Sequence, residues 1–182
     1  METTNGEISL KDEVADRPSD ILSDKLSDRQ KEEYFHRSYT AVDGLWFMKA
    51  EEKYGFEAAL EMDEAVWRIL PKIQARMIKA MMGLESGIDG LEEAIAARLT
   101  LEGFLFETAK AEDGFVVVIS RCPWHDLMVK SGRDHLSERV SEIICRVENS
   151  VWASEFGGAR FEREERICQG AERCLMRFSL SQ

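Results

Sequence analysis

Residues 104–121, 104-FLFETAKAEDGFVVVISR-121, are the most informative part of this chain about its fold class. Residues 104–108 predict a strand, residues 112–114 (EDG) predict a turn, and residues 115–121, which are rich in β-branched side chains, predict a second strand. Together they predict an antiparallel hairpin. Residues 160–167 and 174–180 predict a second pair of strands near the C-terminus.

Helices are predicted on the N-terminal side of the first hairpin. The first begins near Ser27, which can cap it, and runs to Tyr54, where Gly55 supplies a stop. The second covers residues 56–82, and Pro71 predicts a kink or break just before itself because proline cannot continue a helical hydrogen-bond ladder. A third helix is predicted over residues 90–101.

Two further helices are predicted between the hairpins. Pro123 opens a short one, and residues 137–152 show apolar side chains at helical spacing until Gly157 and Gly158. The order of elements predicts an α+β fold, in which N-terminal helices pack with a small antiparallel sheet made of two hairpins (103–121 and 158–180) joined by helices.

The domain organisation follows from this order and from composition. Residues 1–25 predict a disordered acidic tail, and residues 26–182 predict a single domain. Within that domain, residues 26–101 form a helical half and residues 102–182 a hairpin-helix-hairpin half.

The composition limits the kinds of partner that this chain can bind. The 182 residues are 44% hydrophobic, which is enough for a sizeable core, and the formal net charge of −11 argues against binding nucleic acid or an anionic membrane. No targeting segment or apolar span is present, so we expect a soluble, cytoplasmic protein whose cysteines are not paired in disulfides. A homodimer is also expected, because helical layers beside a small sheet often leave an apolar face exposed.

The first helix carries an aromatic face that the periodicity predicts to be buried. Its members are His36, Tyr39, Asp43, Trp46, Phe47, Ala50 and Tyr54. A similar stripe on the second helix contains Asp63 beside Trp67. Because a buried carboxylate needs a partner, these polar residues either lock helices together or line a ligand pocket. The predicted ligand-binding residues are His36, Tyr39, Asp43, Trp46, Asp63 and Trp67.

The four cysteines, Cys122, Cys145, Cys168 and Cys174, lack the spacing of a zinc finger. Three are placed at strand ends or in a connecting turn, Cys168 at the end of the third strand, so they can converge in space. Three interpretations stay open: buried small hydrophobes, a thiolate site for zinc or another metal that uses some of the four cysteines with or without His125, or a catalytic Cys122 assisted by His125. The predicted helix start beside Cys122 favours its thiolate, while His135 is expected to be exposed.

Several segments resemble a known family. They are residues 39–47 (YTAVDGLWF), residues 51–60 (EEKYGFEAAL), residues 121–124 (RCPW), and Cys145, Gly170, Cys174 and Phe178. The first two resemble uncharacterised cytosolic proteins of anaerobic prokaryotes, and the C-terminal half is similar to the L-2-amino-thiazoline-4-carboxylic acid hydrolase-like family and, more distantly, to the 4-vinyl-reductase-type domain. The resemblance implies an α+β ligand-binding fold, thiazoline ring opening, and cysteine metal ligands in the distant relatives. This chain has Arg173-Cys174-Leu175 where the family often has adjacent cysteines.

Three functional hypotheses follow. The leading one is a small-molecule-binding or sensing domain with a pocket between the first helices and the sheet. The second is a hydrolase of a cyclic amidine or thiazoline-type substrate, with Cys122 as nucleophile or metal ligand and His125 as general base. The third is a structural or interaction protein with inert cysteines.

Overall fold

The computed structural model describes residues 25–180, and the predicted tail (1–25) lies outside these residues except for Lys25. The described chain divides into two compact units, with the boundary between Leu45 and Trp46. Helix α2 (Asp28–Tyr54) extends through this boundary. The boundary therefore falls inside the first predicted helix and not at its start.

The predicted helices before the sheet are confirmed. Helix α2 ends where Gly55 takes a φ of +86°, a conformation that favours glycine. The second predicted helix is interrupted and forms two helices, α3 (Phe56–Trp67) and α4 (Leu70–Met82). The interruption lies before Pro71, as expected, because in a continuous helix the proline ring would clash with the Trp67 carbonyl. Helix α5 (Ile88–Leu101) follows.

The two predicted hairpins form one antiparallel sheet. Strands β1 (Leu105–Ala111) and β2 (Gly114–Arg121) form the first, and β3 (Arg160–Glu165) and β4 (Cys174–Ser179) the second. The strand order is β1-β2-β4-β3, so β2 and β4 pair at the centre, with Phe115 opposite Phe178 and Val117 opposite Met176. The α+β class with N-terminal helices is thus confirmed.

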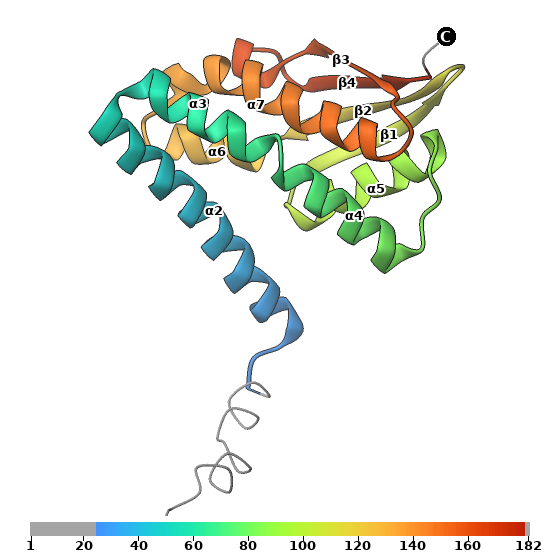
Figure 1. The fold of residues 1–182 in the computed structure, drawn as a ribbon, viewed down its shortest axis with the longest axis horizontal. Coiled ribbons are helices and arrows are strands. Elements are labelled where there is room, and N and C mark those ends of the chain that lie inside the picture. The colour runs from blue at the N-terminus through green and yellow to red at the C-terminus, as the bar shows by residue number, and fades with distance from the viewer. Residues whose placement is uncertain (1–24, 181–182) are drawn as a thin grey trace, which may run out of the picture. The chain divides into compact units, whose positions relative to one another are not determined.

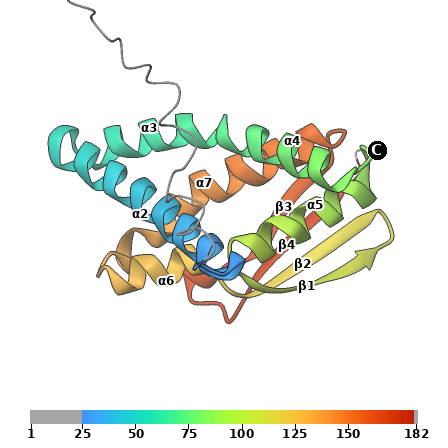
Figure 2. The same ribbon diagram turned by 90° about the horizontal axis from the view of Figure 1, so that it is seen from below.

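Helices α6 (Pro123–Lys130) and α7 (Asp134–Glu155) connect the hairpins. Helix α5 packs on β1 and β2, α7 packs on β3, and α3 and α4 both pack on α7. Figures 1 and 2 show the sheet, α5 with α7, and α3 with α4 as successive layers. A short 3₁₀ helix, η1 (Ile167–Gln169), joins β3 to β4.

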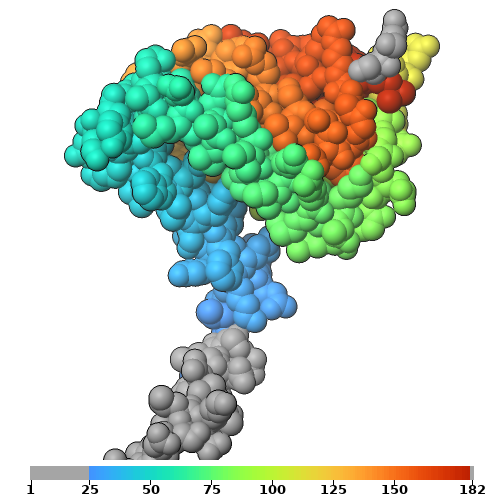
Figure 3. All heavy atoms as spheres, in the orientation of Figure 1, coloured from blue at the N-terminus to red at the C-terminus, as the bar shows by residue number. Residues whose placement is uncertain are grey.

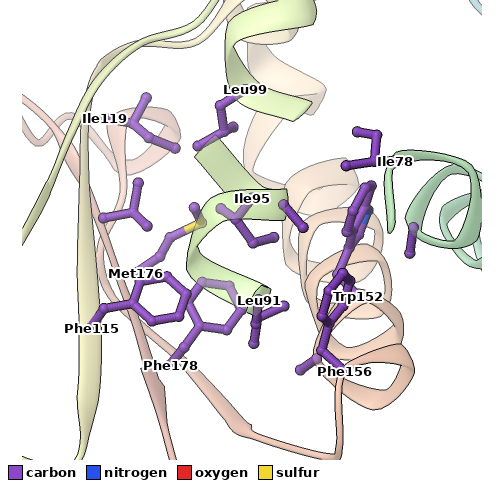
Figure 4. Packing of buried hydrophobic residues seen from close by; sticks show 14 residues of the cluster. Ile78, Leu91, Ile95, Leu99, Phe115, Ile119, Trp152, Phe156, Met176 and Phe178 are labelled. Carbon is purple, nitrogen blue, oxygen red and sulfur yellow. The ribbon is translucent and has the colours of Figure 1, made fainter. Parts of the chain in front are cut away.

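The main core lies between the sheet and helices α4, α5 and α7. Phe115 and Phe178 stack with ring centroids 4.8 Å apart, and alternate residues of β2 point to the same side. Figure 4 shows this sheet layer facing Leu91, Ile95 and Leu99 of α5, with Trp152 and Phe156 of α7 beyond them. A second, smaller cluster joins Leu60, Trp67 and Ile144, so both cores lie within residues 46–182. No described helix is long and apolar enough to cross a membrane.

Candidate functional site

The predicted aromatic face of α2 is not buried. Helix α2 has no buried residue, and the Trp46 side chain is 74% exposed. Tyr54 of the same face is 56% exposed, because an apolar stripe is buried only where another element covers it. His36, Tyr39 and Asp43 belong to the unit of residues 1–45, where all three are half-buried. Their role as ligand-binding residues stays a prediction.

The two predicted site residues of α3 differ in burial. Asp63 is half-buried, whereas Trp67 is 3% exposed and belongs to the small core cluster. The Trp67 ring meets the Trp124 ring edge-on, with centroids 5.8 Å apart. Trp124 in turn donates a long hydrogen bond of 3.5 Å from Nε1 to Glu102 Oε2. Trp67 is therefore connected to a polar cluster in the interior.

Cys122 lies directly before α6, at its N-cap position, as the sequence predicts. The pKa of its thiol is raised, whereas a helix N-terminus was expected to lower it. Backbone N–H groups of His125 and Trp124 lower the pKa of the thiol, yet burial outweighs them and raises it to about 12. The neutral thiol is therefore the stable form at physiological pH. The expectation that the helix N-terminus makes Cys122 a thiolate is wrong, because desolvation is the larger effect.

His125 does not form a side-chain pair with Cys122. Its ring Nδ1 lies 2.8 Å from the Oγ of Ser137, which is buried in the first turn of α7, and its contribution at the Cys122 sulfur comes from the backbone. A general base must reach the proton that it removes, and here the ring is engaged elsewhere. His135 is exposed, as expected.

The four thiols lie directly after β2 (Cys122), in the middle of α7 (Cys145), in η1 (Cys168) and at the start of β4 (Cys174). Burial is the main cause that raises the pKa of Cys145 and Cys174, and Cys122 and Cys174 add smaller electrostatic contributions at Cys145. Cys168 lies in η1 and not at the end of β3 as predicted, and its Sγ lies 2.9 Å from Ser141 Oγ. Among the described residues, no group of three or more His, Cys, Asp or Glu could hold a metal ion. The predicted four-cysteine metal site therefore has no geometric support.

A buried polar cluster between α5 and α7 was not predicted from the sequence. Its members, all under 10% exposed, are Arg98, Glu102, Glu148 and Asn149. Arg98 Nη1 lies 2.7 Å from Glu148 Oε1 as an ion pair, and Arg98 Nη2 donates to Asn149 Oδ1 at 3.1 Å. Asn149 Nδ2 donates to the Cys145 carbonyl at 2.7 Å. These contacts join helices that are about 50 residues apart in sequence.

Two carboxyl groups and one guanidinium share this interior. The pKa of Glu148 is raised to about 7: burial is the largest cause, the Arg98 guanidinium opposes it, and the charge of Glu102 adds to it. A buried carboxyl group is costly to ionise unless it is paired, so Glu148 changes its protonation near neutral pH.

Two hydrogen-bond donors, one in the cluster and one beside it, are not satisfied. Neither Arg98 Nε nor the indole Nε1 of Trp152 finds an acceptor within residues 25–180, and both atoms are buried. The Arg98 guanidinium carbon lies 5.4 Å from the centroid of the Trp152 ring, so both donors belong to the same region. Trp152 itself is 0% exposed and lies beside Ile78 and Phe156 (Figure 4).

One sequence signal could have revealed this cluster. Arg98 continues the buried stripe of α5 that Leu91, Ala94 and Ile95 begin, and Glu148 lies four residues from both Ile144 and Trp152 on α7. A charged residue on an apolar helical stripe is the same signal that Asp43 gives on α2 and Asp63 gives on α3. On α5 and α7 the signal falls in the interior, because these helices contact the sheet.

Comparison with known proteins places the chain in a family. The family described as "Family of unknown function (DUF6125)" matches residues 26–168, and the chain belongs to it. No curated protein and no solved structure matches significantly. The match covers α2 through α7 and β3, and therefore includes the buried polar cluster.

Proposed function

We propose that this family member is a small-molecule-binding domain whose ligand is held between α5 and α7. The observation that carries the proposal is the pair of buried donors, Arg98 Nε and Trp152 Nε1, that lack an acceptor in the described chain. A buried donor without a partner costs about 1–3 kcal/mol. A ligand that offers acceptors to both groups removes this cost on binding.

The charges of the cluster favour an uncharged polar ligand. Glu102 and Glu148 already bring two carboxyl groups to one guanidinium, and the repulsion between them contributes to the raised pKa of Glu148. A further carboxylate would increase this repulsion in a desolvated site. A carbonyl, amide or hydroxyl oxygen satisfies the donors without adding charge.

The cysteines fit this proposal as neutral neighbours of the site. Burial raises the pKa of Cys122 and of Cys145, and both thiols interact electrostatically with Glu148. Neutral buried thiols behave as small apolar side chains. The hydrolase hypothesis has less support, because it needs a Cys122 thiolate and a His125 ring that is not engaged by Ser137.

The test begins with the full chain purified under native conditions. Mass spectrometry of the denatured protein identifies any small molecule that was retained. A panel of uncharged polar compounds is then screened by thermal shift and by tryptophan fluorescence. We expect at least one compound to raise the unfolding temperature and to change the fluorescence, because Trp67, Trp124 and Trp152 lie in or beside the cluster.

Two variants localise the binding. Trp152→Phe keeps an aromatic ring but removes the donor, and Arg98→Lys keeps the charge but removes Nε. Each should weaken binding roughly tenfold or more, given about 1.4 kcal/mol for a tenfold change. Trp46→Phe is the matched control, because Trp46 is 74% exposed. Unchanged affinity in both cluster variants, or the absence of any ligand, would refute the proposal.

A further inference from the structure

An apolar stripe runs along the exposed side of α3 and α4. Its members lie three or four residues apart, which is the spacing of one helical face. They are Met62, Val66, Ile69, Ile73, Met77 and Met81, and their side chains are 47–75% exposed. We call these six residues the α3–α4 stripe.

This stripe is separate from the side of the helices that packs into the protein. Leu60, Trp67, Pro71, Ala75 and Ile78 are buried on the inner side of the same two helices. Because α4 already buries one side, the stripe is a second apolar surface. Contiguous exposed apolar residues of this kind mark interaction surfaces.

The stripe is continuous across the break at Pro71. The two residues between the helices, Arg68 and Ile69, keep right-handed helical backbone angles, and Figures 1 and 2 show α3 and α4 nearly end to end. The space-filling view shows both helices, coloured cyan to green, at the surface (Figure 3). The stripe extends from Met62 to Met81, so it is about 29 Å long at 1.5 Å per residue.

Charge is segregated along this surface. The charged residues of α3 are all acidic: Glu57, Glu61, Asp63 and Glu64. Those of α4 are all basic: Lys72, Arg76 and Lys79. One end of the stripe is therefore flanked by carboxylates and the other by cations.

From these observations we infer that the α3–α4 stripe is the interface of a two-fold symmetric homodimer, with the helices of the two copies antiparallel. A two-fold axis between Ile69 and Leu70 brings Met62 of one copy opposite Met77 of the other. It likewise brings Val66 opposite Ile73, so apolar residues of one copy lie opposite apolar residues of the other. This is the self-complementarity that an isologous interface requires.

The charges select the same arrangement. In the antiparallel dimer, the two-fold axis places the acidic α3 of one copy opposite the basic α4 of the other. The carboxylates of Glu57 and Glu61 therefore face the cations of the partner's α4, which are those of Lys72, Arg76 and Lys79. A parallel pairing would place like charges together, which suppresses it. Lys72 and Arg76 contact Glu155 within their own chain but remain 48% and 64% exposed. This inference does not depend on the proposed ligand site.

Sedimentation or light scattering of the full chain over a concentration series tests the dimer. We expect a species of twice the chain mass of 20.8 kDa. Ile73→Glu should raise the dissociation constant at least tenfold, whereas Val129→Glu, at a residue of similar exposure on α6, should leave it unchanged. Circular dichroism checks that both variants are folded. A wild-type chain that stays monomeric, or a dimer that Ile73→Glu does not weaken, overturns the inference.

Charge reversal and cross-linking test the orientation. Arg76→Glu with Lys79→Glu should weaken the dimer, and adding Glu57→Lys with Glu61→Lys to the same chain should restore it. Ile69→Cys lies at the axis and should cross-link two copies under oxidation. Met81→Cys should not, because its two copies would lie about 35 Å apart along the helices. Failure of the rescue, or cross-linking through Met81→Cys instead, excludes the antiparallel interface.

Discussion

At the scale of single residues, the fold has its clearest effect on the charge of Glu148. Burial between α5 and α7 raises its pKa from 4.5 to about 7. A carboxyl group with a raised pKa holds its proton more tightly in the folded state than in the unfolded state. Its contribution therefore stabilises the fold at low pH and is lost as the pH rises from about 4.5 through 7.

We predict that this residue makes stability fall with pH. At about 1.4 kcal/mol per pKa unit, the free energy of unfolding should fall by on the order of 3 kcal/mol between pH 4.5 and pH 8 through this group. Glu148→Gln should remove that slope, and Glu162→Gln, on an exposed β3 position, should preserve it. Urea titrations of the three proteins at several pH values measure the slopes. Parallel slopes in the wild-type and Glu148→Gln proteins would show that Glu148 does not titrate in this range.

A second prediction at this scale concerns the thiol of Cys122. A pKa of about 12 leaves the thiolate about a thousandfold scarcer than at the ordinary value of 9.0. Native Cys122 should therefore react with iodoacetamide at pH 8 at least a hundredfold more slowly than it does in urea. Time-resolved alkylation followed by peptide mass spectrometry measures the rates at all four cysteines. If Cys122 were modified first in the native protein, the helix N-terminus would outweigh burial after all.

At the scale of elements, the pairing of β2 with β4 holds the two hairpins together. Gly114 begins β2 and lies opposite Ser179. A Cβ at this position would lie 2.0 Å from the Phe178 carbonyl oxygen, a distance that real contacts do not allow. Glycine is therefore required by the close approach of two backbones.

We predict that Gly114→Ala destabilises the protein by roughly 1–3 kcal/mol, because the strands must separate to admit the methyl group. Gly44→Ala is the matched control, since a Cβ there meets nothing within 4 Å and alanine favours a helix. Chemical denaturation of both variants gives the comparison. Equal stability of Gly114→Ala and the wild type would mean that the sheet adjusts without loss.

The elements themselves could be predicted well from local signals. Gly55 ends α2, Pro71 separates α3 from α4, and the β-branched run of β2 forms a strand, because each signal acts on the backbone within a few residues. The burial of a helix face could not be predicted in the same way. The face of α2 around Trp46 has the same periodicity as that of α5, yet only α5 lies on the sheet.

At the scale of the whole molecule, the two core clusters lie entirely within residues 46–182. Phe47 of α2 packs against the smaller cluster, and its ring meets the ring of Phe56 edge-on. This unit therefore contains the packing that makes unfolding cooperative.

We predict that a chain of residues 46–182 folds by itself. Its thermal unfolding should stay cooperative, with a midpoint within about 5 °C of the full chain, since a few degrees correspond to about 1 kcal/mol for a domain of this size. Circular dichroism melts of both chains measure this. A gradual transition, or a much lower midpoint, would show that residues 1–45 are needed for the core.

Local signals in the sequence account for the helices, the two hairpins and the α+β class of this protein, because turns, helix ends and strand propensity are local properties of the backbone. Only the assembled fold sets the strand order β1-β2-β4-β3, the burial of Arg98 with Glu148, and the raised pKa of Cys122. These depend on which distant elements meet. Arg98 and Asn149 are 51 residues apart, and only packing of α5 against α7 removes the water that would otherwise solvate them.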